Sequence, residues 1–421
     1  MHAPIPPLSL FSPLTLPNGT VIRNRIAKAA MEENMADDNQ LPGEALRRLY
    51  ESWSKGGAGL ILSGNVMVDP TALTGPGGVV LDARQPLEPF KAWARSAKSG
   101  GGQVWLQISH PGRQVFAAMG QGAVAPSAIG VDIPGHSHLF PLPQALTADE
   151  IAGIVQRFVT TSKLAEAAGF DGVQIHAAHG YLISQFLSPL SNRRTDAWGG
   201  SLQNRARLLL DVIKAVRAAV SPGFCVAVKL NSADFQKGGF DAADAVQVVR
   251  WLNDLAVDLV ELSGGSYESP AMQGTPQAGS TGAREAYFID FAREIGAVAQ
   301  MPIMVTGGIR HRTIAEQALL PRDGKPGVAM IGIASAMAFE PALPERWKGG
   351  EALEIDIPSV GWRKKVLASL ARMALVKMQL NRLGAGRAPK PGANALFALI
   401  GQQIWTRRRT RRYRAWVARV R

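Results

Sequence analysis

Short apolar runs alternate along the chain with segments of helical periodicity, and this alternation constrains the fold more than any other feature. Strands that alternate with helices favour a parallel sheet. Eight such units over about 310 residues favour an α/β fold of the (β/α)8 TIM barrel type over an open, doubly wound sheet. The predicted strands are 25–30, 59–64, 104–109, 172–177, 225–230, 258–264, 302–307 and 327–332, and the clearest predicted helices are 44–55, 87–98, 148–168, 202–219, 242–255 and 284–298.

Length and charge divide the chain into two parts. Its 421 residues suffice for one large domain of about 250–350 residues and a smaller extension. We predict a barrel over residues 1–345 and a helical extension over residues 346–421. Residues 357–421 contain sixteen Lys and Arg and no Asp or Glu, so they account for the net charge of +13. The first 356 residues carry a net charge of −3 (30 basic against 33 acidic), so any electrostatic attraction of a partner is expected at the extension.

Composition excludes several classes of protein. Apolar residues make up 46% of the chain, which is too many for a disordered segment. The single Cys225 excludes disulfides, four-cysteine zinc sites and cysteine-ligated iron–sulfur clusters, and it fits a reducing compartment. The start of the chain lacks the basic region of a secretory signal, and the longest apolar run, 327–339, is shorter than the ~20 residues of a membrane span. We expect a cytoplasmic protein with no transmembrane segment.

A histidine pair follows the fourth predicted strand, at the end of a barrel where functional residues gather. His176 and His179 can donate hydrogen bonds to an oxygen that gains negative charge, and Tyr181 can donate a proton. Both imidazoles face one site only if the chain turns near Ala178, which Gly180 allows. The alternatives are purely structural histidines and a metal site, although no Asp, Glu or Cys accompanies the pair in a ligand pattern. We therefore predict no metal ligands.

Glycines and two polar residues lie at other predicted strand ends. Gly307, Gly308 and Gly332 close the seventh and eighth strands, where barrels often bind a phosphate through backbone N–H groups. Gln107 can pair with the carbonyl and ring N–H of a heterocycle, and Lys229 can place a positive charge beside an anionic ring. An ordinary polar residue near a barrel mouth is the alternative for both. The sequence contains no Walker A motif.

Several ordered stretches then identify a family. The most specific is 176–196, which begins His-Ala-Ala-His-Gly-Tyr, and the others are 24–31, Gln107 with the His-Pro-Gly-Arg of 110–113, 199–201 and 204–205. Together they span about residues 10–341. The sequence resembles the Old Yellow Enzyme family of FMN-dependent ene-reductases and NADH:flavin oxidoreductases.

The resemblance implies a cofactor and its contacts. FMN would lie across the barrel mouth, with NADH or NADPH as a transient hydride donor. Gln107 would hold the pyrimidine edge of the flavin, and Lys229 would balance the negative charge of the reduced ring. The other implied contacts are Ala29, Ala30, Met31 and Gly64 along the ring, and Gly307, Gly308, Gly332 and Ile333 at the phosphate.

The resemblance also implies the reaction. NAD(P)H would pass a hydride to flavin N5, and N5 would pass it to the β-carbon of an α,β-unsaturated carbonyl compound, a small electron-poor alkene. His176 and His179 would bind the carbonyl oxygen, and Tyr181 would protonate the α-carbon. Glu32 and Tyr267 are implied as further substrate contacts. An NADH oxidase and an amine-oxidising flavoenzyme are the alternatives on the same barrel.

Three residues depart from the family pattern. After Met31, where Cys or Thr commonly touches the flavin, this sequence has Glu32. A carboxylate there would disfavour a reduced, anionic ring or would itself be protonated. Asn34 stands where some relatives have a substrate-facing Tyr. Ile333 replaces an Arg that often grips the phosphate, so we expect phosphate binding to depend on backbone N–H groups and on Ser335.

The extension carries two predicted helices. Residues 361–383 are expected to pack on the outside of the barrel or on a second subunit of a homo-oligomer. After a linker at 385–392, residues 395–421 form an Arg-rich amphipathic helix, which we expect to contact an anionic membrane surface, nucleic acid or an acidic partner. A solvated terminus is the alternative, and a barrel binding module tethered by this tail is the competing function. The apolar residues of the second helix that share one face are Tyr413, Trp416, Val417 and Val420.

Overall fold

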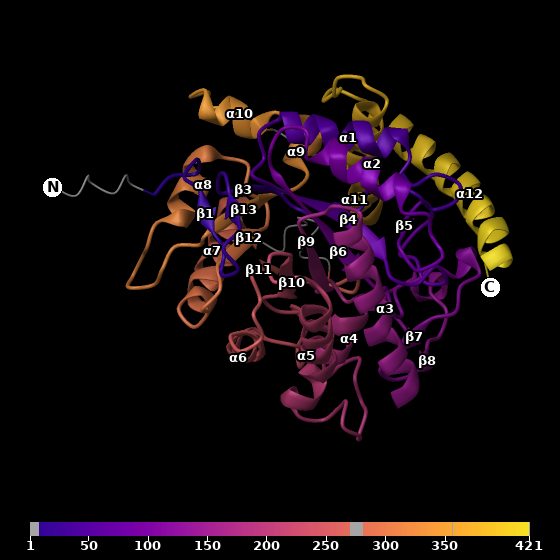
Figure 1. Ribbon diagram of the computed structural model, residues 1–421. Helices are drawn as coiled ribbons and strands as arrows, with labels where there is room; N and C mark the ends of the chain where they lie inside the picture. Colours follow the sequence, from indigo (N-terminus) through magenta and orange to yellow (C-terminus); the bar gives the residue numbers. More distant parts are fainter. Residues whose placement is uncertain (1–7, 270–280, 356, 421) are drawn as a thin grey trace.

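Eight parallel strands close into a barrel in the computed structural model, which describes residues 8–269, 281–355 and 357–420. β3 (Ile26–Lys28) pairs with both β4 (Leu60–Met67) and β13 (Met330–Ile333), so the sheet closes on itself. The predicted barrel and its eight strands are confirmed (Figure 1). The remaining barrel strands are β6 (Gln103–Ser109), β9 (Gly172–Ala177), β10 (Cys225–Asn231), β11 (Leu259–Ser263) and β12 (Ile303–Thr306).

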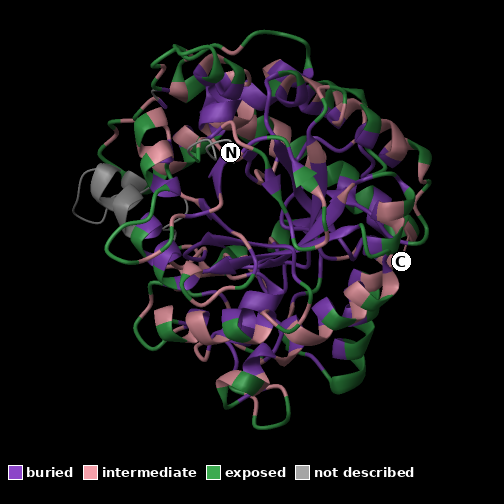
Figure 2. Cartoon of the chain, turned by 60° about the vertical axis from the view of Figure 1, so that its left-hand side comes forward, coloured by how far each residue is buried: buried purple, intermediate pink, exposed green. Residues whose placement is uncertain are grey.

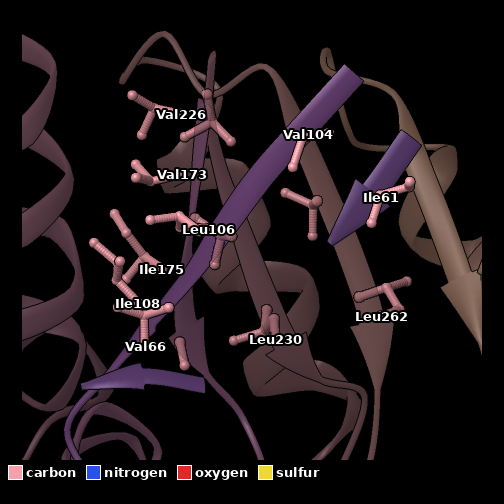
Figure 3. Packing of buried hydrophobic residues seen from close by; sticks show 14 of the residues in the cluster. Ile61, Val66, Val104, Leu106, Ile108, Val173, Ile175, Val226, Leu230 and Leu262 are labelled. Atoms are coloured by element: carbon pink, nitrogen blue, oxygen red, sulfur yellow. The ribbon is translucent and has the colours of Figure 1, made fainter. Parts of the chain in front are cut away.

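Helices surround the barrel and pack on the outward-facing strand residues, some of which are shown in Figure 3. α3 (Ala148–Ala167) begins at a capping box, in which Thr147 and Glu150 each accept a hydrogen bond from the other's backbone N–H. The other helices up to residue 348 are α1 (Glu44–Lys55), α2 (Glu88–Ala97), α4 (Leu182–Leu187), α5 (Leu202–Ala219), α6 (Ala242–Leu252), α7 (Thr281–Gly296), α8 (Arg312–Leu319), α9 (Ala336–Phe339) and α10 (Leu343–Lys348).

The inside of the barrel changes from apolar to polar toward the carboxyl ends of the strands. Leu62, Trp105 and Met304 are fully buried in the apolar layer, and the strands stand at the buried centre of the molecule (Figure 2). The hairpin of β1 (Leu14–Thr15) and β2 (Val21–Ile22) packs against this layer. Because side chains alternate along a strand, the next inward position after Trp105 is Gln107. The polar side chains therefore gather at one mouth of the barrel.

Short elements in the loops complete the fold on the side of β4 and β6. β5 (Val79–Val80) extends the sheet beside β4. The loop after β6 contains the pair β7 (Val124–Ala125) and β8 (Gln144–Ala145), together with the 3-10 turns η1 (Ala117–Met119) and η2 (Ser137–Leu139).

A helical hairpin, α11 (Lys365–Gly384) and α12 (Ala395–Val420), forms the C-terminal extension. α11 packs against α1 and α9, and α12 returns along α11 to the outer edge of the barrel (Figure 1). The Tyr413 hydroxyl donates a 2.9 Å hydrogen bond to the carbonyl of Pro70. Tyr413, Trp416 and Val417 are buried against Met67, Leu73, Val80 and Met119.

The apolar face predicted to meet an external partner, or to remain solvated, is thus covered by the chain's own barrel. The physical reason is that loops distant in sequence supply an apolar surface for Trp416 and its neighbours. None of the described helices is long and apolar enough to cross a bilayer.

The apolar layer inside the barrel predicts a large cost for a cavity. Leu62→Ala should lower the free energy of unfolding by about 2–5 kcal/mol, because Leu62 is fully buried. Leu142→Ala is the matched control, since this leucine is 74% exposed, and it should change stability by less than ~0.5 kcal/mol. Urea denaturation followed by tryptophan fluorescence measures both, and equal effects would contradict the assigned packing.

Candidate functional site

A cavity of about 290 Å³ opens at the carboxyl ends of the barrel strands. It lies where the barrel fold predicts functional residues. Eleven of the fifteen residues predicted from the sequence line it: Ala30, Met31, Glu32, Gln107, His176, His179, Tyr181, Lys229, Gly307, Gly308 and Gly332.

A sharp turn after β9 brings the two imidazoles together. His179 has φ +61° and Gly180 has φ +74°, so the chain reverses in the left-handed region. The backbone N–H of His179 donates to Oδ1 of Asn231 on β10, at 3.1 Å, which holds the turn. The ring centroids of His176 and His179 lie 5.1 Å apart. The predicted turn is confirmed, and both rings border one cavity.

Burial keeps both histidines neutral. It lowers the pKa of His176 well below its usual value, with smaller contributions from His179 and from the positive charge of Lys229. Burial followed by the charge of Lys229 does the same to the pKa of His179. Nδ1 of His176 accepts a 3.2 Å hydrogen bond from the N–H of Ala178, so its proton is on Nε2. His179 Nε2 lies 2.8 Å from Oγ of Ser263. Neutral His176 therefore remains a hydrogen-bond donor through Nε2.

Two tyrosines meet beside the histidines. The ring of Tyr181 lies 4.9 Å from that of His176, edge to face, and its hydroxyl is 3.2 Å from the hydroxyl of Tyr267. Burial raises the pKa of Tyr181 well above its usual value, and Tyr267 and the negative charge of Glu32 raise it further. Glu32 itself accepts a hydrogen bond from the hydroxyl of Thr74. Tyr181 is thus held in its protonated form.

A buried ion pair lies beside His176, because β9 and β10 align His176 with Lys229. Lys229 Nζ is 2.8 Å from Oε1 of Glu261, and Gln174 Nε2 donates to the other carboxylate oxygen at 2.7 Å. All three side chains are buried. The sequence analysis identified Lys229 and missed Glu261, because strand periodicity does not show which inward-facing residues lie opposite each other. The positive charge of Lys229 is therefore already partnered.

The cavity contains polar atoms and close approaches that fit a bound heterocyclic phosphate such as FMN. Gln107 donates through Nε2 to Asn65 at 2.7 Å. Its Oε1 and the Thr306 hydroxyl are buried with no hydrogen-bond partner among the described residues, which indicates a polar ligand. A Cβ on Gly332 would lie 2.0 Å from the Thr306 hydroxyl oxygen, and Gly308 has φ +79°. Gly307, Gly308 and Gly332 thus form a narrow corner of the cavity, the glycine corner, which has no room for side chains.

Four predicted contacts do not line the cavity. Ala29 and Ile333 are buried, and the Ile333 side chain joins the core outside the barrel because it alternates with Gly332. The N–H of Gly64 donates to Glu33 and is hydrogen-bonded to Tyr50, at 3.1 and 3.0 Å. Tyr267 does not line the cavity, and its hydroxyl contacts that of Tyr181, which does.

The C-terminal hairpin contributes residues that sequence analysis missed. Arg372 on α11 lines the cavity, together with Ile357 from the segment before it. Lys377, five residues further along, donates to Oδ1 of Asn34. Asn34 is buried under α11, with φ +57°, and is absent from the cavity lining. Helical periodicity alone does not show which cations of an extension face a distant mouth. Among the described residues, no three His, Cys, Asp or Glu side chains gather to hold a metal ion.

Comparison with known proteins gives consistent matches. The model of the NADH:flavin oxidoreductase / NADH oxidase family matches residues 9–354. An NADH-dependent flavin oxidoreductase of Hypocrea jecorina is 37% identical over 354 residues, which cover 79% of this chain and 87% of that relative. One from Neonectria sp. is 36% identical over 79% of this chain, which spans only 46% of that longer relative. The solved Old Yellow Enzyme homologue of Zymomonas mobilis has a TM-score of 0.69 at 26% identity, over 83% of this chain and 95% of that one.

The lowered pKa values predict histidines that do not titrate near neutrality. Nitrogen-15 NMR of the folded protein should show His176 and His179 neutral from pH 7.5 down to about 6, because burial opposes their charged forms. Since the unfolded chain takes up protons near pH 6.5 and these folded sites do not, the pair should make stability fall as the pH drops below about 6.5. The urea-unfolded chain is the control, and a folded-state titration near 6.5 would contradict the assignment.

Proposed function

Because the chain belongs to the NADH:flavin oxidoreductase / NADH oxidase family, as an FMN-dependent oxidoreductase of the Old Yellow Enzyme type, we propose that it uses NADH or NADPH to reduce an α,β-unsaturated carbonyl compound. The observation that carries this proposal is the convergence of two neutral imidazoles and a protonated tyrosine on one cavity. Family membership sets aside the alternative of a barrel used only as a binding module.

The cavity supplies contacts for the cofactor. FMN would supply the redox chemistry when bound, which is hydride transfer with the nicotinamide as donor and the alkene as acceptor. Gln107 would bind the polar edge of the ring through its unpartnered Oε1. Gly307, Gly308 and Gly332 would leave room for the phosphate, beside Ser335 and Arg310. Lys229 would face the ring as half of an ion pair, so its charge acts together with that of Glu261.

The substrate side of the cavity would polarise an alkene. His176 and His179 would hold the substrate carbonyl oxygen, with Nε2–H of His176 as a donor. Hydrogen bonds to that oxygen withdraw electron density from the conjugated double bond, which makes its β-carbon a better hydride acceptor. Tyr181 would then give its proton to the α-carbon, and Tyr267 lies within reach of its hydroxyl. Burial, with a smaller contribution from the negative charge of Glu32, raises the pKa of both phenols and would keep them protonated.

Two finer expectations belong to the same proposal. The paired, neutral histidines favour alkene reduction over an NADH oxidase or an amine-oxidising reaction, neither of which needs two donors to a carbonyl oxygen. A reducing compartment such as the cytoplasm suits the lone, buried Cys225.

Removing the proton donor should separate the two half-reactions. Tyr181→Phe should slow reduction of a cyclic enone by about 10²–10⁴-fold and leave flavin reduction by NADH nearly unchanged, since only the alkene step needs a proton from Tyr181. His176→Ala with His179→Ala should slow the enone step at least as strongly. Anaerobic stopped-flow absorbance measures both steps. Unchanged enone turnover in these variants would refute the assigned roles.

A side chain at the glycine corner should weaken cofactor binding. Gly332→Ala places a Cβ against Thr306. The side chain of Thr306 or the backbone at residue 332 must then move, which should lower FMN affinity by at least tenfold. Gly122→Ala is the matched control, because a Cβ there meets no atom within 4 Å. Fluorescence titration of the deflavinated proteins with FMN gives the dissociation constants. Equal affinities would show that the phosphate does not bind at the glycine corner.

A further inference from the structure

Exposed apolar side chains gather on the C-terminal hairpin, far more than elsewhere on the described surface. Eight of the fourteen large apolar residues that are exposed belong to α11 and α12, and Phe397 is 74% exposed. Contiguous exposed apolar surface is rare on proteins that have no partner there. Four of them share one face of α12 by helical spacing, and we call these the hairpin patch: Leu396, Phe397, Ile400 and Ile404.

The hairpin patch is the outer face of α12, whose inner face is already packed. Ala398 of α12 is buried with Ala374 and Leu375 of α11, between the two helices. Further along α12, Trp416 is buried on the barrel. Helical spacing places Ile400 and Ile404 on the face opposite to Trp416. The fold of this chain therefore uses the inner face of α12 and leaves its outer face uncovered.

The outer face of α12 becomes cationic where its apolar part ends. Ile404, Arg407 and Arg411 follow at intervals of three and four residues, which keeps them on one face, and both arginines are exposed. Arg408 is exposed beside them, whereas Arg409 and Arg412 turn toward Asp38 on the barrel. No acidic residue occurs in 357–421 to neutralise this surface.

Charge decides between the possible occupants of the hairpin patch. A symmetric contact with a second copy would place the same arginines near each other with no acidic residue of the hairpin between them. Nucleic acid would satisfy the arginines and leave the apolar side chains in water. An anionic lipid surface satisfies both halves, since apolar side chains enter the acyl boundary and arginines contact head groups.

We propose that the hairpin patch docks this enzyme on the surface of an anionic lipid bilayer. Leu396, Phe397 and Ile400 enter the boundary between head groups and acyl chains. Arg407, Arg408 and Arg411 contact the lipid phosphates. This docking surface lies outside the catalytic cavity and does not depend on the proposed alkene substrate.

Vesicle co-sedimentation of the full-length flavoprotein tests the proposal. The protein should bind vesicles that contain phosphatidylglycerol, should bind phosphatidylcholine vesicles at least tenfold less, and should be released at high salt. Arg407→Gln with Arg411→Gln should weaken binding about thirty-fold, at about 1 kcal/mol for each charge near such a surface. Phe397→Ser with Ile400→Ser should weaken it at least tenfold.

Matched controls separate docking from general surface effects. Leu320→Ser removes an exposed leucine and Arg250→Gln an exposed arginine away from the hairpin, and both variants should bind as the parent does. Flavin content and the thermal unfolding temperature show that each variant is folded. Equal binding to both kinds of vesicle, or none to either, would overturn the proposal. So would a dimer that Phe397→Ser dissociates, or binding to DNA in place of vesicles.

Discussion

Pairing of β3 with both β4 and β13 closes the sheet, and the site depends on this closure. In a closed parallel barrel, every strand ends at the same mouth, so residues distant in sequence meet there. The apolar layer that contains Trp105 and Met304 fills the interior of the barrel. The inward-facing polar side chains therefore lie at the mouth, at the carboxyl ends of the strands. The chemistry of the cavity follows from that arrangement.

Burial at the mouth sets the charge state of each group. His176 and His179 are neutral because their charged forms would be poorly solvated next to Lys229. Lys229 tolerates the same environment because Glu261 lies 2.8 Å away. Burial also keeps Tyr181 protonated, because it disfavours the charged phenolate as it disfavours the charged imidazolium. One physical cause thus leaves two neutral imidazoles and one protonated phenol at the mouth.

The C-terminal hairpin is part of this mouth and also part of the outer surface. On its inner side, α11 places Arg372 on the cavity and Lys377 over Asn34. On the outer side of the hairpin, α12 exposes Phe397 and Ile400. The extension therefore contributes Arg372 to the cavity lining and adds an apolar, basic surface of its own.

Local patterns predicted most of the fold and much of the site. The strands and the turn at His179 follow from periodicity and glycine placement, which short windows of sequence reveal. The partnership of Lys229 with Glu261 and the burial of Asn34 depend on barrel register and on a helix more than 300 residues away. The face of Tyr413 and Trp416 was identified, and its partner was not, because an apolar stripe does not specify what covers it.

The visible absorption spectrum of the purified protein, before and after anaerobic addition of NADH or NADPH, tests the central claim most directly. We expect flavin bands that bleach when the nicotinamide is added, since the chain belongs to a family of NADH:flavin oxidoreductases and its cavity offers FMN an unpartnered polar atom on Gln107. A colourless protein that stays colourless after incubation with FMN would contradict it. In that case Gln107 and the glycine corner would not form a flavin site.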